Sequence, residues 1–140
     1  MERWVLYAVL SMLFAGATAV LAKRGLQGVS GELGLAVRTL FVAGFVMVFA
    51  AVWVPAADVA KLSRSNVSWL AASALTTALS WGFYYKALER GEVATVAVID
   101  KGSFVVAVLL AWLVLREPVT PRLWAATGLI LAGLLVAVRR

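Results

Sequence analysis

Leu33–Val54 reads LGLAVRTLFVAGFVMVFAAVWV, and Arg38 is the one charged residue in it. A helix needs about 20 apolar residues to cross the ~30 Å hydrocarbon core of a bilayer. A continuous apolar run of this length is typical of a membrane span rather than of a strand or a helix in a soluble core. The stretch therefore predicts a transmembrane helix.

Further segments of similar length and character lie on both sides of this stretch, separated by short polar connectors. Only helices and closed barrels satisfy every backbone polar group in lipid. We therefore predict an all-α integral membrane protein, a bundle of five transmembrane helices in a single domain over residues 1–140. The predicted helices are Trp4–Ala22, Leu33–Val54, Val67–Leu88, Val93–Leu115 and Arg122–Val138.

Composition supports a membrane protein and excludes several other classes. Of the 140 residues, 64% are hydrophobic and 14% are charged, whereas soluble domains carry about 25% charged residues. With neither cysteine nor histidine, we expect no disulfide, thiolate site or His-ligated metal, and we expect no cofactor. The net charge of +6 is scattered singly between apolar runs, which predicts contact with the lipid bilayer and not with nucleic acid.

Local signals mark the ends of the predicted helices. Gly25, Gly28 and Gly31 are expected to break the chain after the first helix, and Pro55 to end the second. Thr120-Pro121 predicts an N-cap followed by proline in the first turn. The first segment also resembles a secretory signal peptide, but its apolar stretch exceeds the usual 7–15 residues, which favours a retained helix.

The distribution of Lys and Arg leaves the orientation in the membrane nearly balanced. With five spans, one face carries five basic residues, the opposite face six, and two lie within spans, out of 13. Orientation normally follows a clear basic excess on the cytoplasmic side. Either another feature fixes the topology, or the chain inserts both ways round and pairs as an antiparallel homodimer, as inverted repeats do in many transporters.

Two charges inside predicted spans are candidate functional residues, because an ionisable group at the bilayer centre costs about 2.5–3.5 kcal/mol on insertion scales. The predicted helices that carry Arg38 and Asp100 start from the same membrane face, and the two residues lie roughly 8 and 10 Å from that face. We therefore predict that they meet, with Lys101 beside Asp100. Asp100 suits a proton or a cationic solute, and Arg38 suits an anionic one. The alternative is an ion pair that only fixes helix packing.

Lys23 and Lys86 approach the same level of the predicted bundle from the ends of their helices. They either join the charged cluster or extend their amines to the interface, as long lysine side chains commonly do.

A polar stripe on the third predicted helix is a candidate solute path. Its members share one helical face and are bordered by Trp81 and Tyr85; they are Ser73, Thr77, Ser80 and Tyr84. We select Ser80, Trp81 and Tyr84 as candidate solute or coupling-ion residues. The alternative is hydrogen bonding between helices, worth only about 0.6 kcal/mol per bond on average.

The fifth predicted helix carries small residues four positions apart, Gly128 with Ala132 and Gly133 with Ala137. Such spacing allows close helix contact. We predict that Gly128, Ala132 and Gly133 form a subunit contact.

Several patches resemble single-repeat EamA-type proteins of the drug/metabolite transporter superfamily. They are Ala22-Lys23-Arg24-Gly25-Leu26, Ala36-Val37-Arg38-Thr39, Tyr85-Lys86-Ala87-Leu88-Glu89-Arg90-Gly91-Glu92, Val98-Ile99-Asp100-Lys101-Gly102-Ser103, Arg116-Glu117 and Gly128-Leu129-Ile130-Leu131-Ala132-Gly133. The resemblance spans nearly the whole chain.

This resemblance implies a five-helix unit equivalent to half of a ten-helix inverted-repeat exporter, completed by a second copy, in a prokaryotic cell membrane. It also implies transport of small metabolites. The related small multidrug resistance family works through a glutamate in its first helix, but Trp4–Ala22 contains no acid. Asp100 is therefore the one acidic residue inside a predicted span.

The combined hypothesis is a non-enzymatic secondary transporter or exporter of a small organic solute, acting as a homodimer. Nothing resembles a nucleotide-binding loop, so ATP is not the expected energy source. The alternatives are a membrane scaffold that transports nothing and one subunit of a heteromeric transporter or flippase.

Overall fold

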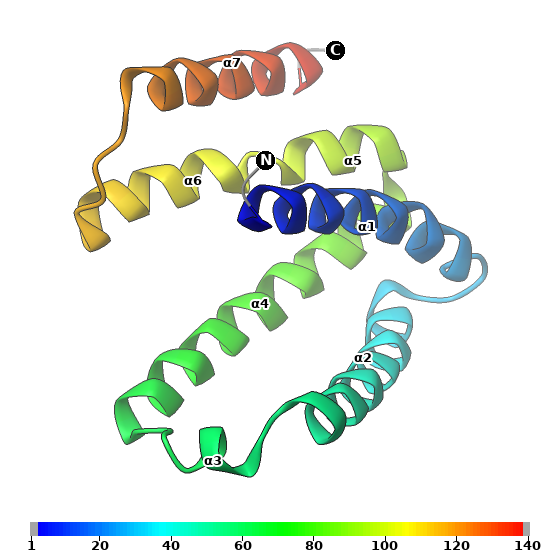
Figure 1. Cartoon of the computed structure of the whole chain (residues 1–140). Helices are drawn as coiled ribbons and strands as arrows, with labels where there is room; N and C mark the ends of the chain where they lie inside the picture. The colour runs from blue at the N-terminus through cyan, green and yellow to red at the C-terminus, as the bar shows by residue number, and fades with distance from the viewer. Residues whose placement is uncertain (1–2, 139–140) are drawn as a thin grey trace. The chain divides into compact units, whose positions relative to one another are not determined.

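The computed structural model describes residues 3–138, and within them every regular element is helical. The elements are α1 (Arg3–Gly25), α2 (Gly31–Trp53), α3 (Ala56–Val59), α4 (Arg64–Arg90), α5 (Val93–Asp100), α6 (Ser103–Leu110), the π-turn η1 (Ala111–Leu115) and α7 (Pro121–Val138). Figure 1 follows them along the chain. The predicted all-α class is confirmed for these residues.

Four stretches within residues 3–138 are long and apolar enough to cross a membrane: Arg3–Gly25, Gly31–Trp53, Val93–Leu115 and Pro121–Val138. They match four of the five predicted spans. The fifth, predicted over Val67–Leu88, forms part of α4. This helix is long enough but less apolar than the other four, and it is not among the candidate spans. Five spans therefore stay a prediction.

The local signals for helix ends are largely confirmed. α1 ends at Gly25, Gly28 has a positive φ of 75°, and α2 ends just before Pro55. At α7, the Thr120 hydroxyl accepts a hydrogen bond from the backbone N–H of Leu123 at 3.3 Å, as an N-cap does. Gly31 differs from its predicted role, because it is the first residue of α2 and not part of the break.

The predicted span over Val93–Leu115 is present with the same bounds, but the chain leaves regular α-helical geometry within it, at Lys101-Gly102 and again at η1. Around the first break, the N–H groups of Gly102, Phe104 and Val105 donate to carbonyls three residues back, as in a 3₁₀ turn. Gly102 also allows close packing, since a Cβ there would lie 3.2 Å from Leu134 of α7.

The chain forms two compact units, which we describe separately. One comprises residues 22–90 and contains the α2–α4 hairpin with α3 in its connection (Figure 1). The buried side chains of this unit are those of Leu26, Tyr85 and Leu88, and Leu88 is fully buried. Many of its other large apolar side chains are exposed, including Leu75, Leu79 and Phe83.

The other unit comprises residues 1–21 and 91–140, of which 3–21 and 91–138 are described. In it α7 packs against α5 and α6. The indole rings of Trp112 in η1 and Trp124 in α7 meet edge to face, with centroids 5.7 Å apart. This geometry is favourable for aromatic pairs, and it holds the start of α7 beside the end of the preceding helix.

Candidate functional site

A groove between α2 and α4 is the candidate site. It has a volume of about 440 Å³, within the range of small-molecule pockets. α2 contributes two lining residues and α4 contributes six; they are Leu35, Thr39, Leu70, Ser73, Ala74, Thr77, Ala78 and Trp81. Because antiparallel helices joined by a short connection lie side by side, the hairpin itself forms both walls.

The groove has an apolar floor and a line of hydroxyl groups. The Thr39 hydroxyl donates to the Leu35 carbonyl at 2.8 Å, and the Thr77 hydroxyl donates to the Ser73 carbonyl at 2.9 Å. Each threonine thus uses its proton within its own helix and keeps oxygen lone pairs as acceptors. Among the described residues, the Ser73 hydroxyl makes no hydrogen bond, so it retains a donor for a bound molecule.

Arg38 is not itself a lining residue, but it contacts Trp81, which lines one end of the groove. Its guanidinium carbon is 4.4 Å from the centroid of the Trp81 ring, a cation–π contact. Its Nη1 is buried and has no hydrogen-bond partner among the described residues. Such a nitrogen is costly, because a buried charged donor normally forms a hydrogen bond.

The predicted polar stripe on α4 contributes to the groove in part. Thr77 and Ser73 line it, together with the bordering Trp81, whereas Ser80 and Tyr84 are not among the lining residues. Ser80 is exposed, and the Tyr84 ring is half-buried and meets the Tyr85 ring edge to face. The groove is therefore turned toward the Trp81 side of the predicted stripe.

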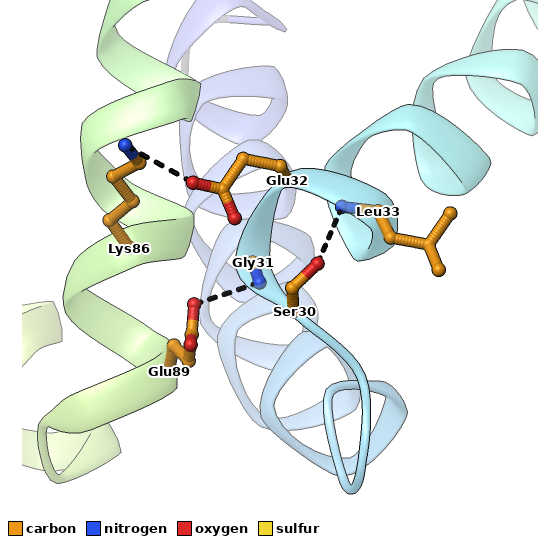
Figure 2. Close-up of polar contacts among 6 residues, drawn as sticks. All are labelled: Ser30, Gly31, Glu32, Leu33, Lys86 and Glu89. Carbon is orange, nitrogen blue, oxygen red and sulfur yellow. Dashed lines mark hydrogen bonds and ion pairs between the residues drawn. The ribbon is translucent and has the colours of Figure 1, made fainter.

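Polar contacts join the start of α2 to the end of α4, at the Trp81 end of the hairpin. The Glu89 carboxylate accepts a hydrogen bond from the Gly31 backbone N–H at 2.9 Å, and Lys86 pairs with Glu32 at 3.1 Å (Figure 2). The Lys23 amine donates to the backbone carbonyl of Leu88. We call the contacts of Lys23, Gly31, Glu32, Lys86 and Glu89 the clasp.

The clasp agrees with helix electrostatics. A carboxylate is favourable at a helix N-terminus and an amine at a helix C-terminus, where each meets the opposite end of the helix dipole. The Glu89 carboxylate lies at the N-terminus of α2, and the Lys23 amine lies at the C-terminus of α4. At Gly31 the helices approach closely, since a Cβ there would lie 3.0 Å from the Tyr85 carbonyl oxygen. The Lys23 and Lys86 amines thus engage partners rather than only extending into the interface.

We expect the substitution Glu89→Gln to weaken the hairpin by about 1 kcal/mol, the typical cost of losing a charged helix cap. The amide oxygen still reaches the Gly31 N–H but brings no charge to the helix dipole. Denaturation of the purified chain in mixed micelles measures the effect. Glu117→Gln is the matched control, since Glu117 lies in the connection between η1 and α7; equal destabilisation by both substitutions would contradict the assignment.

Asp100 and Lys101 lie in the other compact unit, at the break between α5 and α6. Lys101 Nζ is 3.6 Å from Asp100 Oδ2, and both side chains are partly exposed. The break lets these neighbours pair, which a regular helix disfavours by placing them about 100° apart. Arg38 belongs to the other unit, so its predicted ion pair with Asp100 stays a prediction.

The small residues of α7 are not packed against the other helices of their own unit. Gly128, Ala132 and Gly133 are exposed, and a Cβ built on either glycine would meet no atom within 4 Å. Among the described residues of that unit they make no close helix contact. Their predicted role in a subunit contact stays a prediction.

Sequence reasoning missed Thr39, Leu35 and Leu70 in the groove and Glu89 in the clasp. Thr39 and Leu35 are four residues apart and so share one face of α2, a signal hidden by the uniform hydrophobicity around them. Glu89 lies near the C-terminus of α4, where an acid opposes the dipole of its own helix. An acid at this unfavourable position was the signal that could have indicated a partner on another helix.

A chain in which residues 3–138 contain four helices long and apolar enough to cross a membrane is typical of a multi-pass membrane protein. Comparison with known proteins assigns the particular family. The model of the EamA-like transporter family matches residues 2–139, so the chain belongs to this family and is a membrane transporter. No solved structure matches.

A curated relative supports the same assignment. The protein named "Uncharacterized transporter in cobO 3'region", from Sinorhizobium sp, is 32% identical over 138 residues. The alignment covers 98% of each chain. The resemblance to EamA-type proteins drawn from sequence patches is therefore confirmed, and the relative has the size of the same single repeat.

Proposed function

We propose that the chain is a secondary transporter or exporter of a small organic solute in the cell membrane, acting as an antiparallel homodimer. The observation that carries the proposal is the α2–α4 groove: a solute-sized volume lined by hydroxyl groups and by Trp81, on which the charged Arg38 stacks, in a chain of a transporter family. A scaffold would have no need of such a groove.

The groove also supports α4 as a fifth span. Its 27 residues extend about 40 Å at 1.5 Å per residue, enough to cross the hydrocarbon core. Its polar residues Ser73 and Thr77 line the groove, while Leu75, Leu79 and Phe83 are exposed on another face. Polar groups that line a cavity and apolar groups that meet lipid are the normal arrangement in a transporter helix. The polar residues on the groove side of α4 explain why this helix is less apolar overall than the other four.

Five spans explain why a second copy is needed. One repeat offers one groove, and transporters built from inverted repeats place two related halves around a common site. The near balance of basic residues between the two faces allows both orientations of one chain. We propose that Gly128, Ala132 and Gly133 provide part of the contact between the copies, since they are exposed and without side-chain bulk.

Reconstitution into liposomes tests transport itself. Counterflow is measured with labelled phenylalanine, glucose, putrescine and lactate, one probe from each main class of small metabolite. We expect accumulation of at least one probe above protein-free liposomes. A scaffold would accumulate none, and a heteromeric transporter would do so only after addition of its second subunit.

A further inference from the structure

We infer that the α2–α4 groove binds an organic monocarboxylate with an apolar body, whose carboxylate contacts the edge of the Arg38 guanidinium. The inference rests on the proposed transport function and names its substrate class. It follows from the charges around Arg38, from the shape of the stacked guanidinium, and from the lining of the groove.

The counter-charge of Arg38 is missing from its own compact unit. Residues 22–90 contain three acids, Glu32, Asp58 and Glu89. Glu32 pairs with Lys86, Asp58 pairs with Lys61, and Glu89 accepts from the Gly31 N–H. All three carboxylates are thus engaged elsewhere. Within residues 22–90, the positive charge of Arg38 therefore has no carboxylate partner and is open to an anion.

The stacked position of Arg38 decides where the anion binds. Stacking on Trp81 uses the face of the planar guanidinium and leaves its N–H groups pointing outward in the plane. These in-plane donors match a carboxylate, and charge-assisted hydrogen bonds of this kind are among the strongest in proteins. Nη1 is buried and has no hydrogen-bond partner among the described residues, so the protein leaves part of the donor capacity of the guanidinium unused.

The same contact disfavours a cationic solute. The face of an indole ring is a good site for an organic cation, but the positive charge of Arg38 already occupies a face of Trp81. A second cation near this ring would be repelled. A neutral solute would leave the charge of Arg38 uncompensated.

The lining of the groove defines the rest of the molecule. Trp81 and Leu70 are 11 positions apart along α4, so the groove follows this helix for about 16 Å at 1.5 Å per residue. Leu35, Leu70, Ala74 and Ala78 form apolar walls along it. One guanidinium balances one negative charge, so a singly charged acid with an apolar chain or ring fits better than a polyanion.

Binding of labelled hexanoate to the full chain in lipid nanodiscs tests the inference. We expect saturable binding that unlabelled hexanoate displaces, while a tenfold higher concentration of hexylamine or hexanamide does not. Arg38→Gln is expected to lower the affinity at least tenfold, and Arg38→Lys to restore part of it. Arg64→Gln is the matched control, because it removes a positive charge from the other end of α4 without affecting the groove.

Three results would overturn the inference: no saturable hexanoate binding, displacement by hexylamine as effective as by hexanoate, or unchanged affinity in Arg38→Gln. If Arg38→Gln does not fold, as shown by loss of its helical circular dichroism signal, the competition on the unmodified chain decides. Counterflow is read separately. Saturable binding without transport of any probe would refute the transport function and leave the site standing, whereas transport without carboxylate binding would refute only the site.

Discussion

Asp100→Asn is expected to abolish coupled transport by the reconstituted chain. The initial rate of gradient-driven uptake should fall at least tenfold, while the helical content stays unchanged. Asp100 is the last residue of α5, where a negative charge opposes the helix dipole and contributes nothing to helix stability. Its carboxylate lies 3.6 Å from the Lys101 amine at a break in the helix. In transporters, such interrupted helices with charges at the break commonly hold solutes or coupling ions.

The proton or cation that drives transport is expected to act through this carboxylate, because asparagine keeps its shape but neither titrates nor carries charge. Initial rates of counterflow and of gradient-driven uptake measure the effect, with the same solute in both. Glu117→Gln is the matched control, since Glu117 lies in the connection between η1 and α7. Gradient-driven uptake by Asp100→Asn at the unmodified rate would count against a coupling role for Asp100.

Gly31→Leu is expected to separate the start of α2 from the end of α4 and to destabilise the chain by at least about 1–3 kcal/mol, the usual cost of overpacking. A Cβ at Gly31 would lie 3.0 Å from the Tyr85 carbonyl oxygen and 3.1 Å from its carbonyl carbon. Backbone atoms of a helix have no alternative rotamer, so α4 itself must move. The Glu89 contact to the Gly31 N–H would be lost with it.

The midpoint of unfolding in mixed micelles measures this effect. Gly44→Leu is the control on the same helix, because a Cβ at Gly44 would meet nothing within 4 Å. The account predicts a clear loss of stability for Gly31→Leu and little change for Gly44→Leu. Similar midpoints for the two variants would show that the close approach at Gly31 does not hold the hairpin together.

The sequence predicted the helices better than the contacts between them. α1, α2 and α7 agree with their predicted bounds within a few residues, because long apolar runs and the signals at Pro55 and Thr120-Pro121 act locally. The break at Lys101-Gly102 was not predicted. Glycine is common within membrane helices, and what distinguishes Gly102 is the Leu134 side chain packed against it, a residue of another helix.

The candidate site was predicted in part. Arg38 and Trp81 were selected because a charge within a span and an aromatic beside a polar stripe are visible in the sequence. The stacking of Arg38 on Trp81 was not predicted, since it depends on how α2 and α4 face each other. Likewise, Gly31 appears in the sequence as a helix breaker, whereas in the fold it permits the close approach that brings Glu89 to the start of α2.

The antiparallel pairing of five-span chains is tested most directly by mass-tag labelling in intact cells. Because the chain has no cysteine, one cysteine at Ala60 and a second after Arg140 are the only reactive thiols. An impermeant maleimide polymer then counts the external sites on each chain. With five spans the two sites lie on opposite faces, whereas an even number of spans puts them on the same face.

We predict one tag on every chain. In about half of the chains the tag is on the cysteine at position 60, and in the other half on the C-terminal cysteine. Protease cleavage between the two cysteines shows which of them carries the tag. That result requires both an odd number of spans and two orientations. One tag always at the same site would contradict the antiparallel pair by showing a fixed topology. A mixture of chains with two tags and none, or a uniform population of either, would contradict the fifth span.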